Sequence, residues 1–445
     1  MEKTESKKQI LYSLIALSVP VMLEQILSTL LQYVDTAMVG QLGEKATAAV
    51  SVTTTINWLT NCLPSAVSVA ALTLISREVG ANDEKRVREL SAMALKIALF
   101  VGSFLTILCV GVSHILPVWM NAEPDIVGLA GDYYMIISLP MIFRCLNIVL
   151  SAAIRATKDT KTPMFISVGT NVINIGLNYL LIFVFDLGVR GAAIGTAISY
   201  TVGGILMYAV LKKKCDMRLK QASNSDLRLY SNIGLPVLLT SVISCSGYVV
   251  FARLVSGMGT TTFAAHSIAV NLETLFYISG YGLKTAASTL VGISIGERNE
   301  KKFNDVCQLG IMCVLIMMSF SGLCLFVLSP YMMPIFTSSK AVADIGAAML
   351  KIVAFSEPFF GLMVMCEGIL YGLGRPRYVL FVELFGMWAV RILFSYVLVL
   401  KYGKGLEYVW YCMIADNVSK ALILTLPFLK RTNRTRMFER VNVLK

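Results

Sequence analysis

The sequence predicts an all-α polytopic membrane protein with twelve transmembrane helices in two six-helix bundles. Three observations predict this class: the composition, a series of long apolar runs and an internal repeat. Of the 445 residues, 56% are hydrophobic and only 15% are charged, whereas soluble domains carry about 25% charged residues. The composition therefore excludes an ordinary soluble fold.

The apolar runs give the predicted spans, because a helix needs about 20 apolar residues to cross a bilayer. Their approximate limits are 12–39, 46–76, 90–114, 126–153, 163–185, 190–211, 230–257, 262–295, 303–328, 346–371, 376–400 and 407–429. The predicted organisation is a first bundle at 1–211, a basic linker at 212–229, a second bundle at 230–429 and a basic tail at 430–445.

The basic residues orient these spans. If the N-terminus is cytoplasmic, the segments on that side carry 27 Lys and Arg, and the opposite loops carry 5. Cytoplasmic loops are enriched in Lys and Arg, so we expect both termini and the linker in the cytoplasm and the protein in the plasma membrane. The net charge of +12 is explained by this topology, and we expect no nucleic-acid partner.

An internal repeat relates the two halves. A shift of 216 residues aligns Pro20 with Pro236 and Gly43 with Gly259, without a gap. Because each half has an even number of spans, the second enters the membrane from the same side as the first, as in parallel transporter repeats. Two like bundles around a central cleft predict alternating access, and hence transport.

The first span carries one polar stripe. Glu24 and Asp35 are its only charged residues, and eleven residues at about 100° each bring them to nearly the same helix face. Ser28 and Gln32 fall on that face as well. Carboxylates inside a span are costly and usually face a cavity or a partner, so the stripe is a candidate functional surface.

Polar residues also share one face in three other spans. In span 5, Asn171, Asn174 and Asn178 follow the spacing i, i+3, i+7. The candidate cavity residues of spans 2 and 8 lie at positions that the repeat aligns, and they are Asn57, Asn61, Glu273, Tyr277, Tyr281 and Lys284. A charge at each end with tyrosines between them would suit an amphipathic organic cation. The alternative is that each residue pairs with a neighbouring helix for structural reasons.

Several motifs carry a resemblance to a known family. They are VDTAMVGQLG at 34–43, LISREVGAND at 74–83, LVGISIGERN at 290–299, GAAIGTAISY at 191–200 and WAVR at 388–391. With them the chain resembles the multidrug and toxic compound extrusion (MATE) family, in its DinF-like bacterial branch, over essentially its whole length. The resemblance implies export of organic, often cationic compounds, driven by inward flow of Na+ or H+ and without a cofactor.

The resemblance also implies a coupling-cation site in the first half. The family's ligand positions fall on Asp35, Asn174, Asn178 and Thr196, and Asn178 departs from the pattern, which has Asp there. Asp35 is then the only acid of the set. Four oxygen ligands would suit Na+, whereas a proton would need Asp35 alone; the retained amides and hydroxyl favour Na+ slightly. In the repeat these ligands meet Phe251, Val390, Phe394 and Cys412, so we expect coupling in the first half only.

Two other functions were weighed. A flippase of lipid-linked sugars or another large amphiphile would be expected to have a more basic cavity and often extra helices. A membrane-embedded enzyme needs a nucleophile with a base or a metal set, but the two His lie in different halves and neither HExxH nor GxSxG occurs. We therefore expect a monomeric transporter of small organic molecules in the lipid bilayer, and no enzyme. The ten Cys have no metal-ligand spacing and are interpreted as packing residues.

The remaining charges in the last three spans are interpreted as structural. They are Glu357, Glu367, Glu383, Arg391, Asp416 and Lys420. Asp416 and Lys420 lie one turn apart and are expected to form a simple i, i+4 pair.

The orientation is tested by labelling from outside the cell. A cysteine introduced at Lys340 or Lys404 should react with a membrane-impermeant maleimide in intact cells, because the distribution of Lys and Arg places both loops outside. Labelling only after permeabilisation would overturn the orientation.

Overall fold

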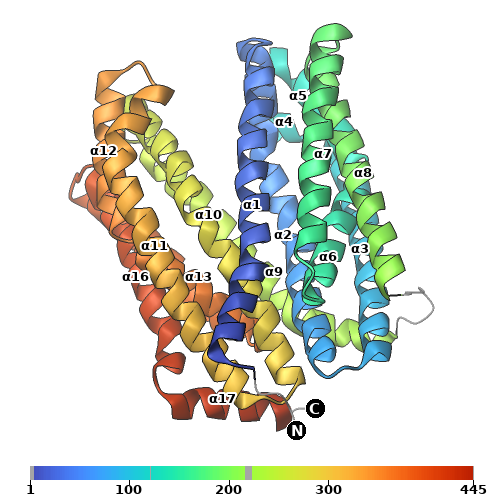
Figure 1. Cartoon of the computed structure of the whole chain (residues 1–445). Helices are drawn as coiled ribbons and strands as arrows, with labels where there is room; N and C mark the ends of the chain where they lie inside the picture. The colour runs from blue at the N-terminus through green and yellow to red at the C-terminus, as the bar shows by residue number, and fades with distance from the viewer. Residues whose placement is uncertain (1–4, 121, 216–222, 444–445) are drawn as a thin grey trace. The chain divides into compact units, whose positions relative to one another are not determined.

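The computed structural model describes residues 5–120, 122–215 and 223–443. Within these residues the regular structure is entirely helical (Figure 1). The helices of the first half are α1 (Lys7–Gly40), α2 (Glu44–Gly80), α3 (Glu84–Val112), α4 (Leu116–Trp119), α5 (Pro124–Ser138), α6 (Met141–Ala156), α7 (Lys161–Tyr179) with its π-helical continuation η1 (Leu180–Val184), and α8 (Gly188–Cys215).

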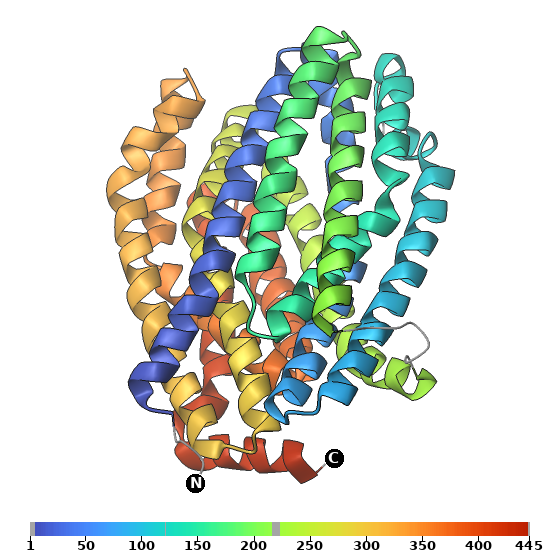
Figure 2. The same cartoon turned by 45° about the vertical axis from the view of Figure 1, so that its right-hand side comes forward.

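The second half repeats this order of elements (Figure 2). Its helices are α9 (Asn224–Ser256), α10 (Thr260–Gly296), α11 (Glu300–Phe336), α12 (Lys340–Ala354), α13 (Glu357–Gly372), α14 (Pro376–Leu384), η3 (Phe385–Ile392), α15 (Leu393–Tyr396), η4 (Val397–Lys401), α16 (Leu406–Leu429) and α17 (Arg431–Val443). Helix α17 occupies the predicted basic tail. Part of the predicted linker, residues 216–222, lies outside the described residues.

Eleven of the twelve predicted spans are found as apolar membrane-crossing helices among the described residues. Nine are single helices, and two are pairs that bend, α5 with α6 by 49° and α12 with α13 by 56°. The span predicted at 262–295 is helix α10, whose 37 residues are more than long enough to cross. It does not reach the same apolarity, since its middle carries Glu273, Lys284 and three further polar or aromatic-hydroxyl side chains, Asn271, Tyr277 and Tyr281.

The described chain packs as two compact units. The N-terminal unit is Leu23–Leu238, and the C-terminal unit is Met1–Met22 together with Leu239–Lys445. The chain therefore passes between units inside α1 and inside α9, two residues after Pro20 and Pro236. The predicted halves follow the sequence repeat, whereas these units follow packing.

Each unit has its own apolar core. In the N-terminal unit α2, α3, α6 and α8 pack together, and Ile75, Leu150 and Ile154 are fully buried there. In the C-terminal unit α10, α11 and α13 pack against one another, and a second core gathers Leu350, Val353 and Trp410.

The repeat is visible in the backbone. Gly43 and Gly259 precede α2 and α10 with φ of 100° and 107°, a region that glycine enters without steric cost. Asp83 and Asn299 cap α3 and α11, each accepting a hydrogen bond from the backbone N–H three residues later at 2.9 Å. Because these pairs are all related by 216 residues, the shift found in the sequence also relates the two folds.

The turn between α6 and α7 shows how a connection outside the spans is held. Asp159 accepts hydrogen bonds from the Thr162 N–H at 3.0 Å and from the Lys214 ammonium at 2.9 Å. Burial alone would raise the pKa of Asp159, but these two donors and the Lys214 charge lower it overall. The turn is therefore stabilised by an ionised carboxylate at neutral pH.

Close helix packing in the C-terminal unit depends on glycine. A Cβ at Gly368 of α13 would lie 2.5 Å from the carbonyl oxygen of Lys284 on α10. We expect Gly368→Ala to push these helices apart and lower the free energy of unfolding by about 1–3 kcal/mol, measured as a lower denaturation midpoint in detergent. The control is Gly280→Ala, whose Cβ would meet Met318 Sδ at an ordinary 3.7 Å. An equal loss of stability in both variants would contradict the packing argument.

Candidate functional site

The four residues expected to bind the coupling cation form one connected cluster in the N-terminal unit. Asn178 on α7 donates through Nδ2 to Asp35 Oδ1 on α1 and to Asn174 Oδ1 at 3.4 Å. Asn174 Nδ2 in turn donates to Thr196 Oγ1 on α8 at 3.3 Å. The sequence prediction that these residues come together therefore agrees with the geometry, and which ion they bind is considered below.

Local backbone structure creates the space for this cluster. Asn178 is fully buried, one residue before the end of α7. Gly195 lies opposite on α8, and a Cβ there would collide with Asn178 Oδ1. That oxygen is buried and has no hydrogen-bond donor among the described residues. Together with the Asp35 carboxylate it supplies the hard oxygen ligands that Na+ prefers.

The other residues of the predicted α1 stripe have separate partners. The Glu24 carboxylate accepts two hydrogen bonds from Arg155 Nη2, at 2.8 and 2.7 Å. Asn171 Nδ2 donates to Ser28 Oγ at 3.0 Å, and Gln32 is exposed. Glu24, proposed from sequence as a cavity residue, is thus a paired acid, whereas Asp35 has no Lys or Arg partner within the described chain.

The polar residues of α2 meet a basic residue that the sequence analysis did not select. Arg144 of α6 donates through Nη1 to Asn57 Oδ1 at 3.5 Å and lies 5.2 Å from the Tyr200 ring centroid. Asn61 Oδ1 is buried without a donor in the part of the chain that the structure describes. The signal that could have identified Arg144 is its position inside an apolar span.

The two charged residues of α10 differ in their surroundings. Lys284 Nζ forms an ion pair with Glu367 of α13 at 2.7 Å and lies 5.6 Å from the Tyr281 ring centroid. Glu273 is only 7% exposed, and the described residues include neither a hydrogen-bond donor nor a cation for it. Tyr277 lies between them and packs on Phe360, with ring centroids 4.7 Å apart.

A four-charge network lies in the interior of the C-terminal unit. Arg391 pairs with Asp416 at 2.8 Å, and Lys420 contacts both Asp416 at 3.0 Å and Glu383 at 2.9 Å. Glu383 also accepts a hydrogen bond from Ser244 Oγ at 2.6 Å. The i, i+4 contact of Asp416 and Lys420 is confirmed, but it is one link in a network that joins α9, α14, η3 and α16.

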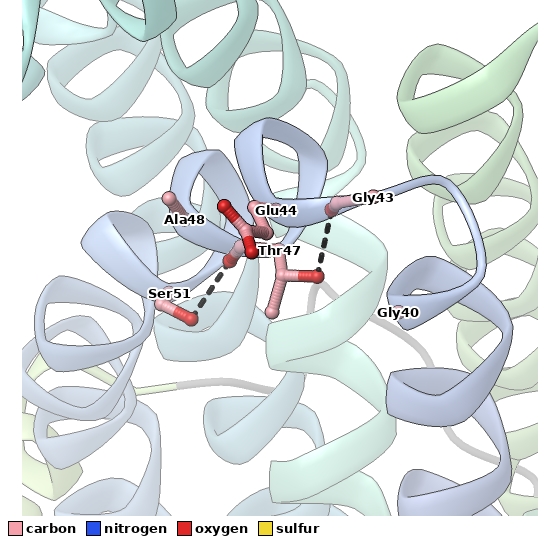
Figure 3. Close-up of a pocket in the computed structure, with 6 residues that line it drawn as sticks. All are labelled: Gly40, Gly43, Glu44, Thr47, Ala48 and Ser51. Carbon is pink, nitrogen blue, oxygen red and sulfur yellow. Dashed lines mark hydrogen bonds between the residues drawn. The ribbon is translucent and has the colours of Figure 1, made fainter.

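The pocket in Figure 3 is not at any of these sites. It is an open depression of about 450 Å³ at the turn between α1 and α2. Its lining residues are Gly40, Gly43, Glu44, Thr47, Ala48 and Ser51. Thr47 Oγ1 donates to the Gly43 carbonyl oxygen at 3.1 Å, and Ser51 Oγ donates to the Thr47 carbonyl oxygen at 2.8 Å. Since the helix backbone already satisfies these hydroxyls, the pocket offers little for specific recognition.

Metal catalysis finds no support in the described part of the chain. Those residues contain no group of three or more His, Cys, Asp or Glu placed to hold a metal ion. The ten cysteines are free, and none is fully exposed. The acids instead lie inside membrane-crossing helices, in two repeated bundles, which is the arrangement of an ion-coupled membrane transporter.

Comparison with known proteins agrees with this class. The MatE family model matches residues 20–180 and 236–397, which correspond to one segment in each sequence half. The chain therefore belongs to the MatE family and is a membrane transporter rather than an enzyme.

Similar proteins extend over nearly the whole chain. A probable multidrug resistance protein NorM of Thermotoga maritima is 29% identical and is matched over 99% of this chain and 97% of its own. The probable multidrug resistance protein YpnP of Bacillus subtilis is 26% identical over 87% of this chain and 88% of its own.

Solved structures share the fold. A transporter of the MOP superfamily from Pyrococcus furiosus has a TM-score of 0.89 at 23% identity and is covered over 99%, with 98% of this chain. The Vibrio cholerae MATE transporter VcmN in its bent form has a TM-score of 0.88 at 20% identity, with the same coverage of both chains.

The four-charge network is tested by removing one cation. Lys420→Met should lower the free energy of unfolding by about 3–5 kcal/mol, because it leaves Asp416 and Glu383 buried without that partner. The matched control is Lys45→Met, whose ion pair with Asp125 is largely exposed and should contribute less than about 1 kcal/mol. Thermal denaturation in detergent measures both, and a neutral Lys420→Met would contradict a stabilising network.

Proposed function

We propose that this protein is a secondary active multidrug efflux antiporter. It exports amphipathic, cationic organic compounds across the plasma membrane in exchange for Na+ or H+, with both termini in the cytoplasm. The observation that carries the proposal is the cluster of Asp35, Asn174, Asn178 and Thr196, an acid held by amides inside a span and not by a basic side chain.

The reasoning for coupling starts from the cost of an isolated carboxylate in a membrane. Such a group is retained where it serves ion or proton movement. Asp35 is the only acid of its cluster, so its charge is the quantity that ion loading changes. Glu24 lies on the same helix but is neutralised by Arg155, which leaves Asp35 as the coupling residue.

The choice of ion depends on the neighbouring oxygens. A sodium ion would be bound by the Asp35 carboxylate with the Asn174 and Asn178 amide oxygens and the Thr196 hydroxyl. The unpartnered Asn178 Oδ1 favours this arrangement, since an amide rotation would bring it toward the carboxylate. A proton would occupy Asp35 alone, and the amides would then only orient the acid.

The reasoning for substrate rests on the C-terminal unit and on the relatives. Glu273 is buried without a cation in the described chain, and the rings of Tyr277 and Tyr281 follow it along α10. A carboxylate next to aromatic rings suits an organic cation. Curated relatives that cover almost the whole chain are named as multidrug resistance proteins, which supports the same class of substrate.

The test is dye efflux from proteoliposomes under sodium and proton gradients imposed separately. We expect Asp35→Asn to abolish gradient-driven efflux with either ion while substrate binding persists, because the amide can neither bind a proton nor neutralise Na+. Asn178→Ala should reduce sodium-driven efflux at least about tenfold, one lost ligand costing 1.4 kcal/mol or more, and affect proton-driven efflux much less.

The matched control is Asp125→Asn, an acid in the same unit that is exposed and paired with Lys45. It should keep full efflux. Full efflux by Asp35→Asn would refute the coupling mechanism for both ions.

A further inference from the structure

Two acids in the C-terminal unit have no cation to balance them. Apart from the charges where α11 meets α17, the buried charged side chains of α10, α13, α14, η3 and α16 are three cations and five acids. Lys284, Arg391 and Lys420 pair with Glu367, Asp416 and Glu383. The two acids that remain are Glu273 and Glu357.

These two acids lie at the same level of adjacent helices. Contacts between α10 and α13 join Tyr277 to Phe360, Lys284 to Glu367 and Ser288 to Gly372. The helices are therefore parallel, with residue numbers offset by 83 or 84. The same offset places Glu357 beside Glu273, four residues before the Tyr277 contact.

Glu357 is the more deeply buried of the two. It is 1% exposed and its Oε2 has no donor among the described residues, whereas Glu273 is 7% exposed. Glu357 also begins α13, directly after the 56° bend from α12. Two carboxyl groups close together in a buried site cannot both ionise, so such a pair retains one proton.

An aromatic cluster adjoins this pair. The rings of Tyr277, Tyr281 and Phe360 lie 4.7 to 6.2 Å apart, centroid to centroid. Tyr281 is 38% exposed, so the cluster is more open than the two carboxyl groups. An organic cation placed on these rings would gain cation–π attraction and lie next to Glu273.

Resting on the proposed export of organic cations, we propose that Glu273 and Glu357 form a cation–proton exchange site. In the empty site Glu357 holds one proton and Glu273 carries one negative charge. When an organic cation binds beside Glu273 on the tyrosines, the Glu357 proton leaves to water. The site then holds two carboxylates and one organic cation, and its net charge of −1 is unchanged. Drug binding in this unit thus releases a proton independently of Asp35.

The surroundings permit this exchange. Arg391 is the basic residue that acts on Glu273 electrostatically, but it is already paired with Asp416 and lies 5.5 Å from the Tyr248 ring centroid. From α11, Ser321 donates to the Phe276 carbonyl oxygen and Gly322 lies against Glu357, so this side carries no charge.

The remaining ionisable neighbours are also occupied or remote. Lys284 is paired with Glu367, and His266, almost two turns before Glu273, packs against Trp410 at 5.7 Å between ring centroids. On α12, Asp344 and Lys351 are exposed. A proton on the acid pair is therefore not replaced by a neighbouring fixed cation.

Infrared spectroscopy of the purified full chain tests the proton without any substrate. In an Asp35→Asn background at neutral pH, the C=O stretch of a protonated carboxylic acid should be present. Glu357→Gln should remove it, because Glu273 alone can ionise near Arg391. The matched control Glu407→Gln changes an exposed acid at the start of α16 and should leave the band. Absence of the band in the parent, or its persistence in Glu357→Gln, would overturn the proposal.

A second measurement tests the exchange and guards against misfolding of one variant. Adding tetraphenylphosphonium to weakly buffered protein should bleach the band and release about one proton per bound cation. Glu273→Gln should keep the band, bind tetraphenylphosphonium about tenfold more weakly (1.4 kcal/mol) and release no proton. Binding without proton release in the parent would overturn the exchange. Since the infrared band needs neither gradient nor substrate, a failure of drug efflux would count against the proposed function alone.

Discussion

The structure depends on one constraint: a charge inside the hydrocarbon layer must be paired or must serve transport. The mildest insertion scales assign about 2.5–3.5 kcal/mol to a charged side chain at the centre of a span, a large part of the net stability of a domain. Most buried charges meet the constraint by pairing, as Glu24 does with Arg155 and Lys284 with Glu367. The exceptions are acids, and they mark the sites at which we place function.

The two units meet this constraint differently although their backbones are repeats. Glycines at 43 and 259 and caps at 83 and 299 keep the same geometry in both halves. The side chains have diverged: the N-terminal unit holds amides around one acid, and the C-terminal unit holds a neutral network of four charges beside two acids. Backbone symmetry thus supports two different kinds of polar site.

Sequence reasoning predicted what depends on spacing within one helix. The spans, the repeat, and the shared faces of Asp35 and of Asn174 with Asn178 follow from periodicity, and Thr196 came with the family resemblance. Partners on other helices were missed, including Arg155, Arg144 and the link of Glu383 to Lys420. Such pairs depend on how each helix is rotated and shifted against its neighbour, and one sequence does not contain that information. Arg155 was also assigned to a turn, although its side chain reaches Glu24.

The passage of the chain between units inside α1 and α9 has a consequence for biogenesis. Residues up to Met22 pack with a unit whose other members begin at Leu239. Because synthesis proceeds from the N-terminus, the first turns of α1 wait for more than 200 residues before their packing partners exist. Contacts so distant in sequence are slow to form. The C-terminal unit can therefore mature only as a late step of assembly, whereas every segment of the N-terminal unit has been synthesised once Leu238 is in place.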